Sequence, residues 1–281
     1  MDRFFPRFCT WCIGLLLAFM ACGQRSSVEK FSRSNSFEPG NERMMALLDS
    51  AERAGDDRRD TAFKMVETVL LWSLDAADRV TEARSYAVLA GLFTKEDQCD
   101  LAISYYDKCV ETSPDPNTTV VFRARFEKAK CLRKMNRLLQ ARTELEALKL
   151  VVERTASSGM VPEINNQIAG ILLDIDDIAR SDQVLKENAG YLNGADKALF
   201  GSKNAEVQAE TKLLQGLVSF KDEKRAEGLG FIGEAWAAAD SVGGSKERYK
   251  LKSDIADKLE ANGQLDLTEQ YRTELSGTYA W

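Results

Sequence analysis

Residues 83–116 read ARSYAVLAGLFTKEDQCDLAISYYDKCVETSPDP, and this stretch decides the fold. Its large and small residues recur at intervals of three and four, and they are Tyr86, Leu89, Ala90 and Phe93, followed by Ala102, Tyr106 and Cys109. Such spacing places them on one face of each of two helices. Pro114 comes next and marks the end of the second helix. The stretch therefore predicts a helical hairpin whose small residues let its two helices approach closely.

The same residues resemble the tetratricopeptide repeat (TPR). That repeat has an aromatic residue, Leu-Gly and an aromatic residue on its first helix, then Ala, an aromatic residue and Pro in its second half. In this sequence Tyr86 replaces the usual Trp, Ala90 the Gly and Cys109 the small Ala. The resemblance implies a stacked array of hairpins, in which the first helices line one surface and polar residues there meet a ligand.

Small residues recur along the chain at a regular spacing. In the second helix of successive units they are Ala62, Ala102, Ala141, Ser181 and Gly228, which lie 40, 39, 40 and 47 residues apart. The residues twelve positions before them are Ser50, Ala90, Ala129, Ala169 and Gly216. The period of about 40 residues is longer than the roughly 34 of the TPR, which indicates longer helices or loops.

Helical spacing and Gly or Pro punctuation divide residues 42–281 into about six hairpins. We expect them at residues 42–53 with 60–80, at 83–116, at 119–137 with 138–154, at 164–173 with 179–188, at 205–220 with 226–241, and at 245–262 with 265–275. Residues 190–204 form a longer connection. Strand signals are nearly absent, so the predicted fold class is all-α. The TPR resemblance implies a right-handed solenoid of these hairpins.

The first 22 residues have the pattern of an export signal. Arg3 and Arg7 precede WCIGLLLAFMA, residues 11–21, an uncharged run that is too short for a membrane span of roughly 20 residues. Ala21 stands directly before Cys22, and this arrangement resembles the lipobox of bacterial lipoproteins. The resemblance implies removal of residues 1–21 and a lipid, with palmitate-type acyl chains, on Cys22. An ordinary cleaved signal and an uncleaved anchor remain as alternatives.

Residues 22–41 are polar and Ser-rich, which predicts a flexible tether.

Composition excludes several classes of function. The net charge is −6, and removal of residues 1–21 makes it −7, which disfavours nonspecific nucleic-acid binding. The chain has no His, so Ser-His and Cys-His catalysis and the common zinc sites are removed. It has neither a Gly-rich phosphate loop nor a Gly-x-Ser-x-Gly elbow. Asp174, Asp176 and Asp177 lack the central Gly of an EF-hand loop and indicate an inter-helix turn. We expect no enzyme activity, cofactor or metal.

Three cysteines follow Cys22, at positions 99, 109 and 131. Cys99 and Cys109 are separated by about 15 Å along one expected helix, a distance that no disulfide spans. Three thiols cannot all pair, so we expect small buried core residues. A Cys109–Cys131 bridge across neighbouring hairpins is the alternative.

The sign of the charge reverses between Val120 and Arg142, where eight basic residues accompany one acid, Glu127. Repeat proteins that grip an acidic peptide terminus use first-helix positions of this kind. By that resemblance the candidate peptide-binding residues are Arg84, Lys95, Arg123, Lys130, Arg133, Lys134 and Arg137. The alternative is that these charges solvate an exposed helix and pair with acidic neighbours, among them Glu111, Glu144 and Glu146.

These features predict a lipid-anchored TPR scaffold of the bacterial cell envelope, at the outer membrane or the periplasmic face. Its expected partner is a protein or peptide, with an acidic segment bound on the basic surface, and not a nucleic acid. A sharper version resembles the repeat lipoproteins of outer-membrane assembly, or those that dock murein hydrolases. The alternative is a sensor module of a TPR-containing bacterial transcriptional regulator or signalling protein, truncated before its membrane helix and output domain.

Overall fold

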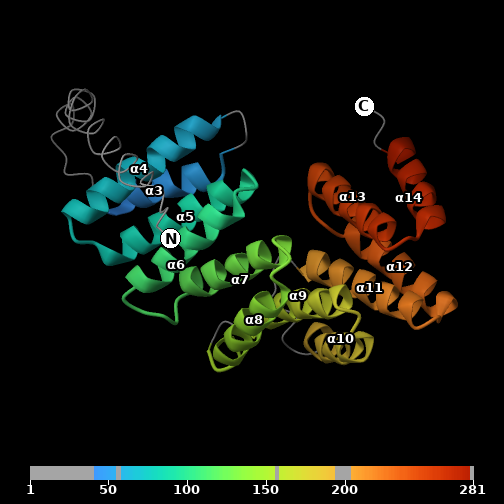
Figure 1. The fold of residues 1–281 in the computed structure, drawn as a ribbon. Helices are drawn as coiled ribbons and strands as arrows, with labels where there is room; N and C mark the ends of the chain where they lie inside the picture. Colours follow the sequence, from blue (N-terminus) through green and yellow to red (C-terminus); the bar gives the residue numbers. More distant parts are fainter. Residues whose placement is uncertain (1–40, 55–57, 156–157, 194–203, 279–281) are drawn as a thin grey trace, which may run out of the picture. The chain divides into compact units, whose positions relative to one another are not determined.

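The computed structural model describes residues 41–54, 58–155, 158–193 and 204–278, and in these residues every regular element is helical (Figure 1). The chain divides into two units, residues 1–47 and 48–281. The described part of the first unit is the beginning of α3, and the second unit contains the other elements. The α-helices are α3 Asn41–Glu52, α4 Arg59–Asp75, α5 Arg79–Lys95, α6 Cys99–Thr112, α7 Thr119–Lys134, α8 Leu138–Val152, α9 Val161–Asp174, α10 Ile178–Asn193, α11 Asn204–Lys221, α12 Arg225–Asp240, α13 Ser245–Ala261 and α14 Leu265–Thr278, with a 3₁₀ turn at Ser158–Met160.

The predicted all-α class is confirmed, and most helix bounds agree with the sequence to within a few residues. The expected helix over 60–80 is wrong, because α4 ends at Asp75 and α5 begins at Arg79. Asp78 caps α5, since its Oδ1 atom accepts 3.1 Å hydrogen bonds from the backbone N–H groups of Val80 and Thr81. The expected connection over 190–204 is shorter than predicted, because α10 continues to Asn193.

One turn geometry joins six pairs of successive helices in the described residues, namely α4–α5, α5–α6, α7–α8, α9–α10, α11–α12 and α13–α14. In each of these turns a single residue adopts positive φ, and these residues are Ala77, Asp97, Asn136, Asp176, Glu223 and Gly263. The backbone N–H of the next residue then bonds back to the helix, as from Arg137 N to Leu132 O at 2.8 Å. This is the Schellman arrangement, which satisfies the last carbonyls of a helix. From Asp97 onward the turns are spaced 39, 40, 47 and 40 residues apart, so the repeat of the sequence is a repeat of the backbone.

Within residues 48–281, each helix from α4 to α13 packs against the helix that follows it. The helices α5, α7, α9, α11 and α13 also contact one another in that order, so they form a row. The row is made from the first helices of the second to the sixth expected hairpins. Residues on this row are therefore brought close to one another although they are about 40 positions apart in the sequence.

The small residues mark the places where paired helices touch. Ser181 Oγ donates a 3.0 Å hydrogen bond to the carbonyl of Ala169, twelve residues earlier, and both residues are fully buried. A Cβ atom at Gly216 would lie 3.2 Å from the carbonyl oxygen of Gly228, closer than most Cβ contacts, so glycine favours this approach of α11 to α12. The prediction for Ser50 is wrong: Ser50 is exposed, and its neighbour Ala51 is buried instead.

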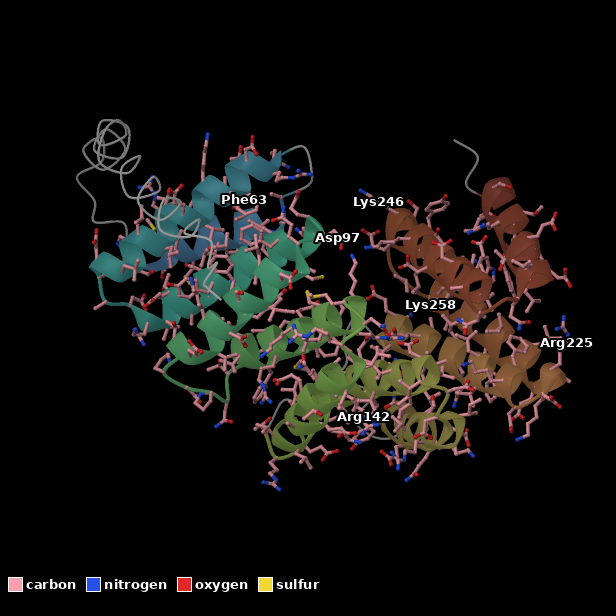
Figure 2. All side chains as sticks on the ribbon, in the orientation of Figure 1. Phe63, Asp97, Arg142, Arg225, Lys246 and Lys258 are labelled. Carbon is pink, nitrogen blue, oxygen red and sulfur yellow. The ribbon has the colours of Figure 1, made fainter. Side chains whose placement is uncertain are left out.

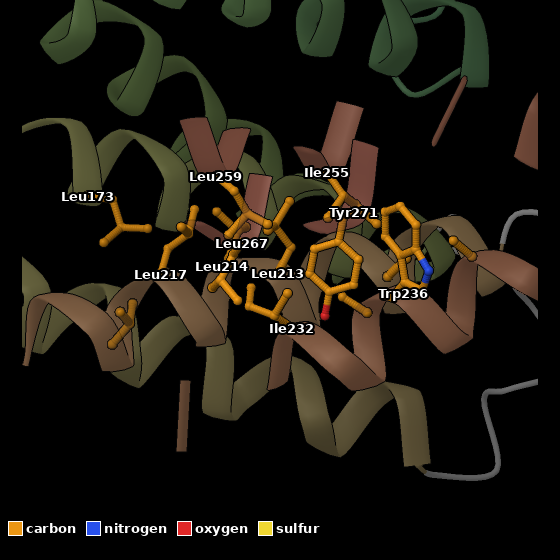
Figure 3. Close-up of a cluster of buried hydrophobic side chains, with 14 of the residues drawn as sticks. Leu173, Leu213, Leu214, Leu217, Ile232, Trp236, Ile255, Leu259, Leu267 and Tyr271 are labelled. Atoms are coloured by element: carbon orange, nitrogen blue, oxygen red, sulfur yellow. The ribbon is translucent and has the colours of Figure 1, made fainter. Parts of the chain in front are cut away.

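The final hairpin repeats the same contact, which the sequence analysis did not identify. Thr268 Oγ1 lies 3.5 Å from the carbonyl of Ala256, again twelve residues away. Figure 3 shows the apolar core that joins this hairpin to α11 and α12. The Trp236 and Tyr271 rings lie 4.3 Å apart there, and Trp236 Nε1 donates a 2.7 Å hydrogen bond to Glu274. The last hairpin is thus fixed to the preceding one by both apolar and polar contacts.

The predicted signal segment, Cys22 and residues 23–40 of the predicted tether lie outside the described residues, while Asn41, the last residue assigned to the tether, begins α3. Among the helices that the structure describes, none has both the length and the apolar composition that a membrane crossing requires.

Candidate functional site

A groove of about 610 Å³ runs over the row formed by α7, α9, α11 and α13. Its floor is apolar, because Phe126, Val207, Leu213 and Ile255 reach it with at most 5% of their surface exposed. Its sides carry four basic and six acidic residues, which are Arg123, Lys130, Arg133 and Lys258, and Glu127, Glu163, Glu206, Glu210, Asp254 and Asp257. Figure 2 shows Lys258 on the α13 side of this row. The groove thus has charged sides and an apolar floor.

The basic side of the groove belongs to α7, and each of its cations has an acidic partner. Arg123 Nη1 lies 2.8 Å from Glu163 Oε2, Lys130 Nζ 2.8 Å from Glu127 Oε2, and Arg133 Nε 2.7 Å from Asp174 Oδ2. The Arg133 guanidinium also covers Gly170, where a Cβ atom would lie 2.5 Å from Arg133 Nη1. These ion pairs orient the cations along the groove.

Aromatic contacts hold two of these cations in place. The Arg123 guanidinium and the Lys130 ammonium each lie 5.7 Å from the centroid of the Phe126 ring. A cation over an aromatic face is stabilised by the ring quadrupole. Phe126 is therefore both part of the apolar floor and a support for the basic side.

The remaining candidate residues do not line the groove. Arg84 pairs with Asp49, and Lys95 Nζ donates a 3.0 Å hydrogen bond to the last carbonyl of α3, that of Glu52. Lys134 Nζ lies 2.6 Å from Asp97 Oδ1, a contact that raises the pKa of Lys134. Arg137 Nε donates to Gln140 Oε1 at 2.6 Å. The structure therefore brings together Arg123, Lys130 and Arg133 and separates the other four from them.

Pairing with acidic neighbours, the alternative considered for the basic stretch, is also observed. Arg125 Nε lies 2.5 Å from Glu144 Oε1, and Arg142 Nε lies 3.2 Å from Glu146 Oε1. Lys128 Nζ lies 2.5 Å from Asp107 Oδ1. These three cations lie outside the groove lining.

The opposite side of the groove is acidic, which was not expected from the sequence. Glu210 Oε1 lies 3.2 Å from Lys258 Nζ, and Asp257 Oδ1 lies 2.8 Å from Arg272 Nη2. Within the residues that the structure describes, the carboxylates of Glu206 and Asp254 form neither an ion pair nor a hydrogen bond. Burial raises the pKa of Asp254, although Lys250 and Lys258 oppose the shift.

The repeat spacing contains a signal for part of this side. Steps of 39, 40, 47 and 40 residues lead from Arg84 to Arg123, Glu163, Glu210 and Lys250. The same position therefore changes sign along the row, from basic on α5 and α7 to acidic on α9 and α11. A comparison of equivalent first-helix positions would have found Glu163 and Glu210 beside the basic helix.

Neither the family models nor the curated proteins give a match to this chain. Among solved structures it is similar to BtubC (BKLC) from P. vanneervenii, with a TM-score of 0.60 and 14% identity over 71% of this chain and 80% of that one. It is also similar to aspartyl phosphate phosphatase F from Bacillus subtilis, with a TM-score of 0.60 and 13% identity over 84% of this chain and 58% of that one. Both are helical-repeat proteins, and at these identities the likeness shows the fold alone. The chain therefore has the fold of a helical-repeat protein.

Proposed function

We propose that this chain is a protein-interaction scaffold, a right-handed solenoid of TPR-like hairpins whose groove holds an extended segment of a partner protein. The observation that carries the proposal is the groove itself, with a buried apolar floor and charged sides drawn from four successive first helices. Apolar contact supplies affinity in such a site, and fixed charges on its sides select the sequence of the segment.

The charge pattern favours a segment with opposite charges toward its two sides. An acidic side chain of the partner lies against Arg123, Lys130 and Arg133, in exchange for the carboxylates that pair with them in the free protein. A basic side chain of the partner lies toward Glu206 and Asp254, which line the other side. The partner segment is therefore acidic on one side, as expected from the sequence, and also carries a basic residue on the other side.

The candidate residues themselves provide a matched test. The variant Lys130→Glu/Arg133→Glu reverses charge inside the groove, and Lys134→Glu/Arg137→Glu makes the same change outside it. After cross-linking in cells and affinity purification, we expect the first variant to lose the partner recovered by the unchanged protein and the second to retain it. Both variants should keep the same helical content by circular dichroism. Retention of the partner by both variants would reject the groove as the binding site.

A photo-reactive residue locates the contact directly. Placed at Glu206, which lines the groove, it should cross-link to the same partner, and mass spectrometry should identify one segment with both acidic and basic residues. Placed at Arg180, whose side chain is 66% exposed outside the groove lining, it should not. Equal cross-linking from both positions would contradict a defined site.

We further propose that a lipid on Cys22 anchors the scaffold in the bacterial cell envelope. The support is the sequence pattern of residues 1–22 alone, and several acyl chains at about 0.8 kcal/mol per buried CH₂ are sufficient for a stable anchor. Cys22→Ala should move the protein from the membrane fraction to the soluble fraction and abolish labelling by a palmitate analogue. Unchanged fractionation without labelling would reject the anchor while leaving the groove proposal intact.

A further inference from the structure

Gln167 is the one neutral polar side chain among the described residues that line the groove, and the other lining residues are charged or apolar. It lies on α9, where every other residue from Val161 to Leu173 except Glu163 is buried. In the row, α9 contacts both α7 and α11. Gln167 therefore presents a carboxamide to the groove between its basic and its acidic side.

Two hydrogen bonds fix the orientation of this carboxamide. Arg133 Nη1 donates to Gln167 Oε1, and Gln167 Nε2 donates to Glu210 Oε1, each at 3.4 Å. A guanidinium only donates hydrogen bonds and an ionised carboxylate only accepts them, so the amide oxygen faces α7 and the amide nitrogen faces α11. Both bonds are longer than the usual maximum of about 3.2 Å, so a ligand replaces them at small cost.

A carboxamide suits the backbone of an extended peptide. On the apolar floor the backbone N–H and C=O groups of a bound segment lose water and need new partners. Each charged side chain of the groove offers either donors or acceptors, whereas a carboxamide offers both. An extended residue presents its own N–H and C=O toward the same side, as in the paired residues of an antiparallel sheet. Gln167 can therefore hold both groups of one partner residue at once.

We propose that Gln167 fixes the direction of the bound segment, so that the partner chain runs from α7 toward α11 and α13. This inference rests on the proposed function, in which the groove holds an extended segment. The N–H of the partner residue donates to Gln167 Oε1 on the α7 side, and its C=O accepts from Gln167 Nε2 on the α11 side. Because the nitrogen of a residue precedes its carbonyl carbon, the N-terminal part of the segment lies over α7.

This direction sets the order of the charges in the segment. The acidic residue meets the cations of α7 and therefore comes first, whereas the basic residue meets Glu206 on α11 or Asp254 on α13 and comes last. Packed helices lie about 8–10 Å apart, and two or three such steps lead from α7 to α11 or α13. At about 3.3 Å for each extended residue, the two charges are separated by about five to nine residues.

The test uses the full chain and two peptides of identical composition, EESLVLSKK and its reverse KKSLVLSEE, both acetylated and amidated at their ends. The reverse peptide either matches its charges to the groove and loses the two hydrogen bonds to Gln167, or keeps those bonds and places its charges on the wrong sides. Isothermal titration calorimetry should therefore show that EESLVLSKK binds about tenfold more tightly.

The variant Gln167→Met keeps the length of the side chain and removes its donor and its acceptor. It should weaken the binding of EESLVLSKK about tenfold and leave the two peptides with nearly equal affinity. Gln140→Met makes the same change at an exposed residue outside the groove lining and should leave the preference unchanged. Circular dichroism should show the same helical content for both variants.

Equal binding of the two peptides by the unchanged protein, or tighter binding of the reverse peptide, would overturn the proposed direction. A preference that survives Gln167→Met would overturn the role of Gln167. Failure of both peptides to bind would also overturn the inference, whereas the groove proposal is decided separately by capture of the cellular partner. In the Lys130→Glu/Arg133→Glu variant we expect both peptides to lose binding, which would place the measured contact in the groove.

Discussion

Asn165 Nδ2 donates a 2.8 Å hydrogen bond to Asn188 Oδ1, and both side chains are fully buried. Asn188 Nδ2 in turn donates to Asn166 Oδ1 at 2.8 Å and to the carbonyl of Pro162 at 3.0 Å. Thr211 on α11 donates to Asn166 Oδ1 at 2.9 Å. A polar network therefore connects α9, α10 and α11 inside an otherwise apolar array. Its members bond to one another, although Asn165 Oδ1 is buried without a hydrogen-bond partner, so removal of one member leaves further buried groups without hydrogen bonds.

Asn188→Ala should lower the free energy of unfolding by about 2–4 kcal/mol, because the Asn165 and Asn166 side chains lose a buried partner. Urea denaturation monitored by circular dichroism measures the change. Lys186→Ala, two residues earlier on the exposed face of α10, is the matched control and should change stability by at most about 0.5 kcal/mol. A similar small effect for Asn188→Ala would mean that the network does not stabilise the fold.

Gly216→Ala should destabilise the protein by about 1–3 kcal/mol. A Cβ atom there would lie 2.5 Å from Ile232 Cδ1 and 3.2 Å from the Gly228 carbonyl oxygen, so the Ile232 side chain must move and the close contact between α11 and α12 must loosen. Gly233→Ala makes the same chemical change on the exposed face of α12, where no atom lies within 4 Å of the new Cβ. It should raise stability by about 0.5–1 kcal/mol through helix propensity. Thermal unfolding should therefore shift in opposite directions for the two variants.

Glu223→Gly should stabilise the protein by about 0.5–1 kcal/mol. Glu223 has φ of 59°, a left-handed conformation that is unfavourable for a residue with a side chain. The gain in the folded state is reduced, although not cancelled, by the greater freedom of glycine in the unfolded chain. The converse change Gly263→Ala, at φ of 75° in the equivalent turn, should lower stability. If both substitutions shift the denaturation midpoint in the same direction, the shared turn geometry is not the cause.

Stability should decrease at alkaline pH. Burial raises the pKa of the Cys109 and Cys131 thiols from 9.0 to about 11, so the folded state holds these protons more tightly than the unfolded state. Their contribution is therefore fully present below pH 9 and is lost as the pH rises to about 11. In that window each thiol lowers the free energy of unfolding by about 1.4 kcal/mol for each unit that the pH rises. Under reducing conditions, Cys109→Ala/Cys131→Ala should flatten the dependence measured by urea titration, and an unchanged slope would contradict the burial effect.

Part of the candidate site could be read from the sequence, and part could not. Arg123 and Lys130 follow from helical spacing within α7, because residues at such intervals share one face. Lys134 and Arg137 fit the same spacing, but α7 ends at Lys134, and their side chains bond to Asp97 and Gln140 outside the groove. The acidic side depends on α11 and α13, which meet α7 only through the stacking of several hairpins.

The thiols illustrate the same limit. The sequence correctly indicates that Cys99 and Cys109 lie on one helix, and that Cys131 belongs to the next hairpin. Whether two of them meet depends on the rotation and offset of α7 against α6, and local spacing does not contain that information. The structure holds all three as free thiols buried in one apolar cluster, the role expected from the sequence, and no Cys109–Cys131 bridge is formed.

The sequence by itself determined the helices, their pairing and the repeat of about 40 residues, because these depend on local propensity and on small residues at fixed offsets. The stretch at residues 83–116 already contained that rule in its Ala90 and Ala102 pair. Only the tertiary structure decided which charges meet across hairpins, and that the basic helix faces acidic neighbours instead of an open surface. Such contacts join residues about 40 positions apart, and their geometry is fixed by packing of the buried faces, not by the pattern of any one helix.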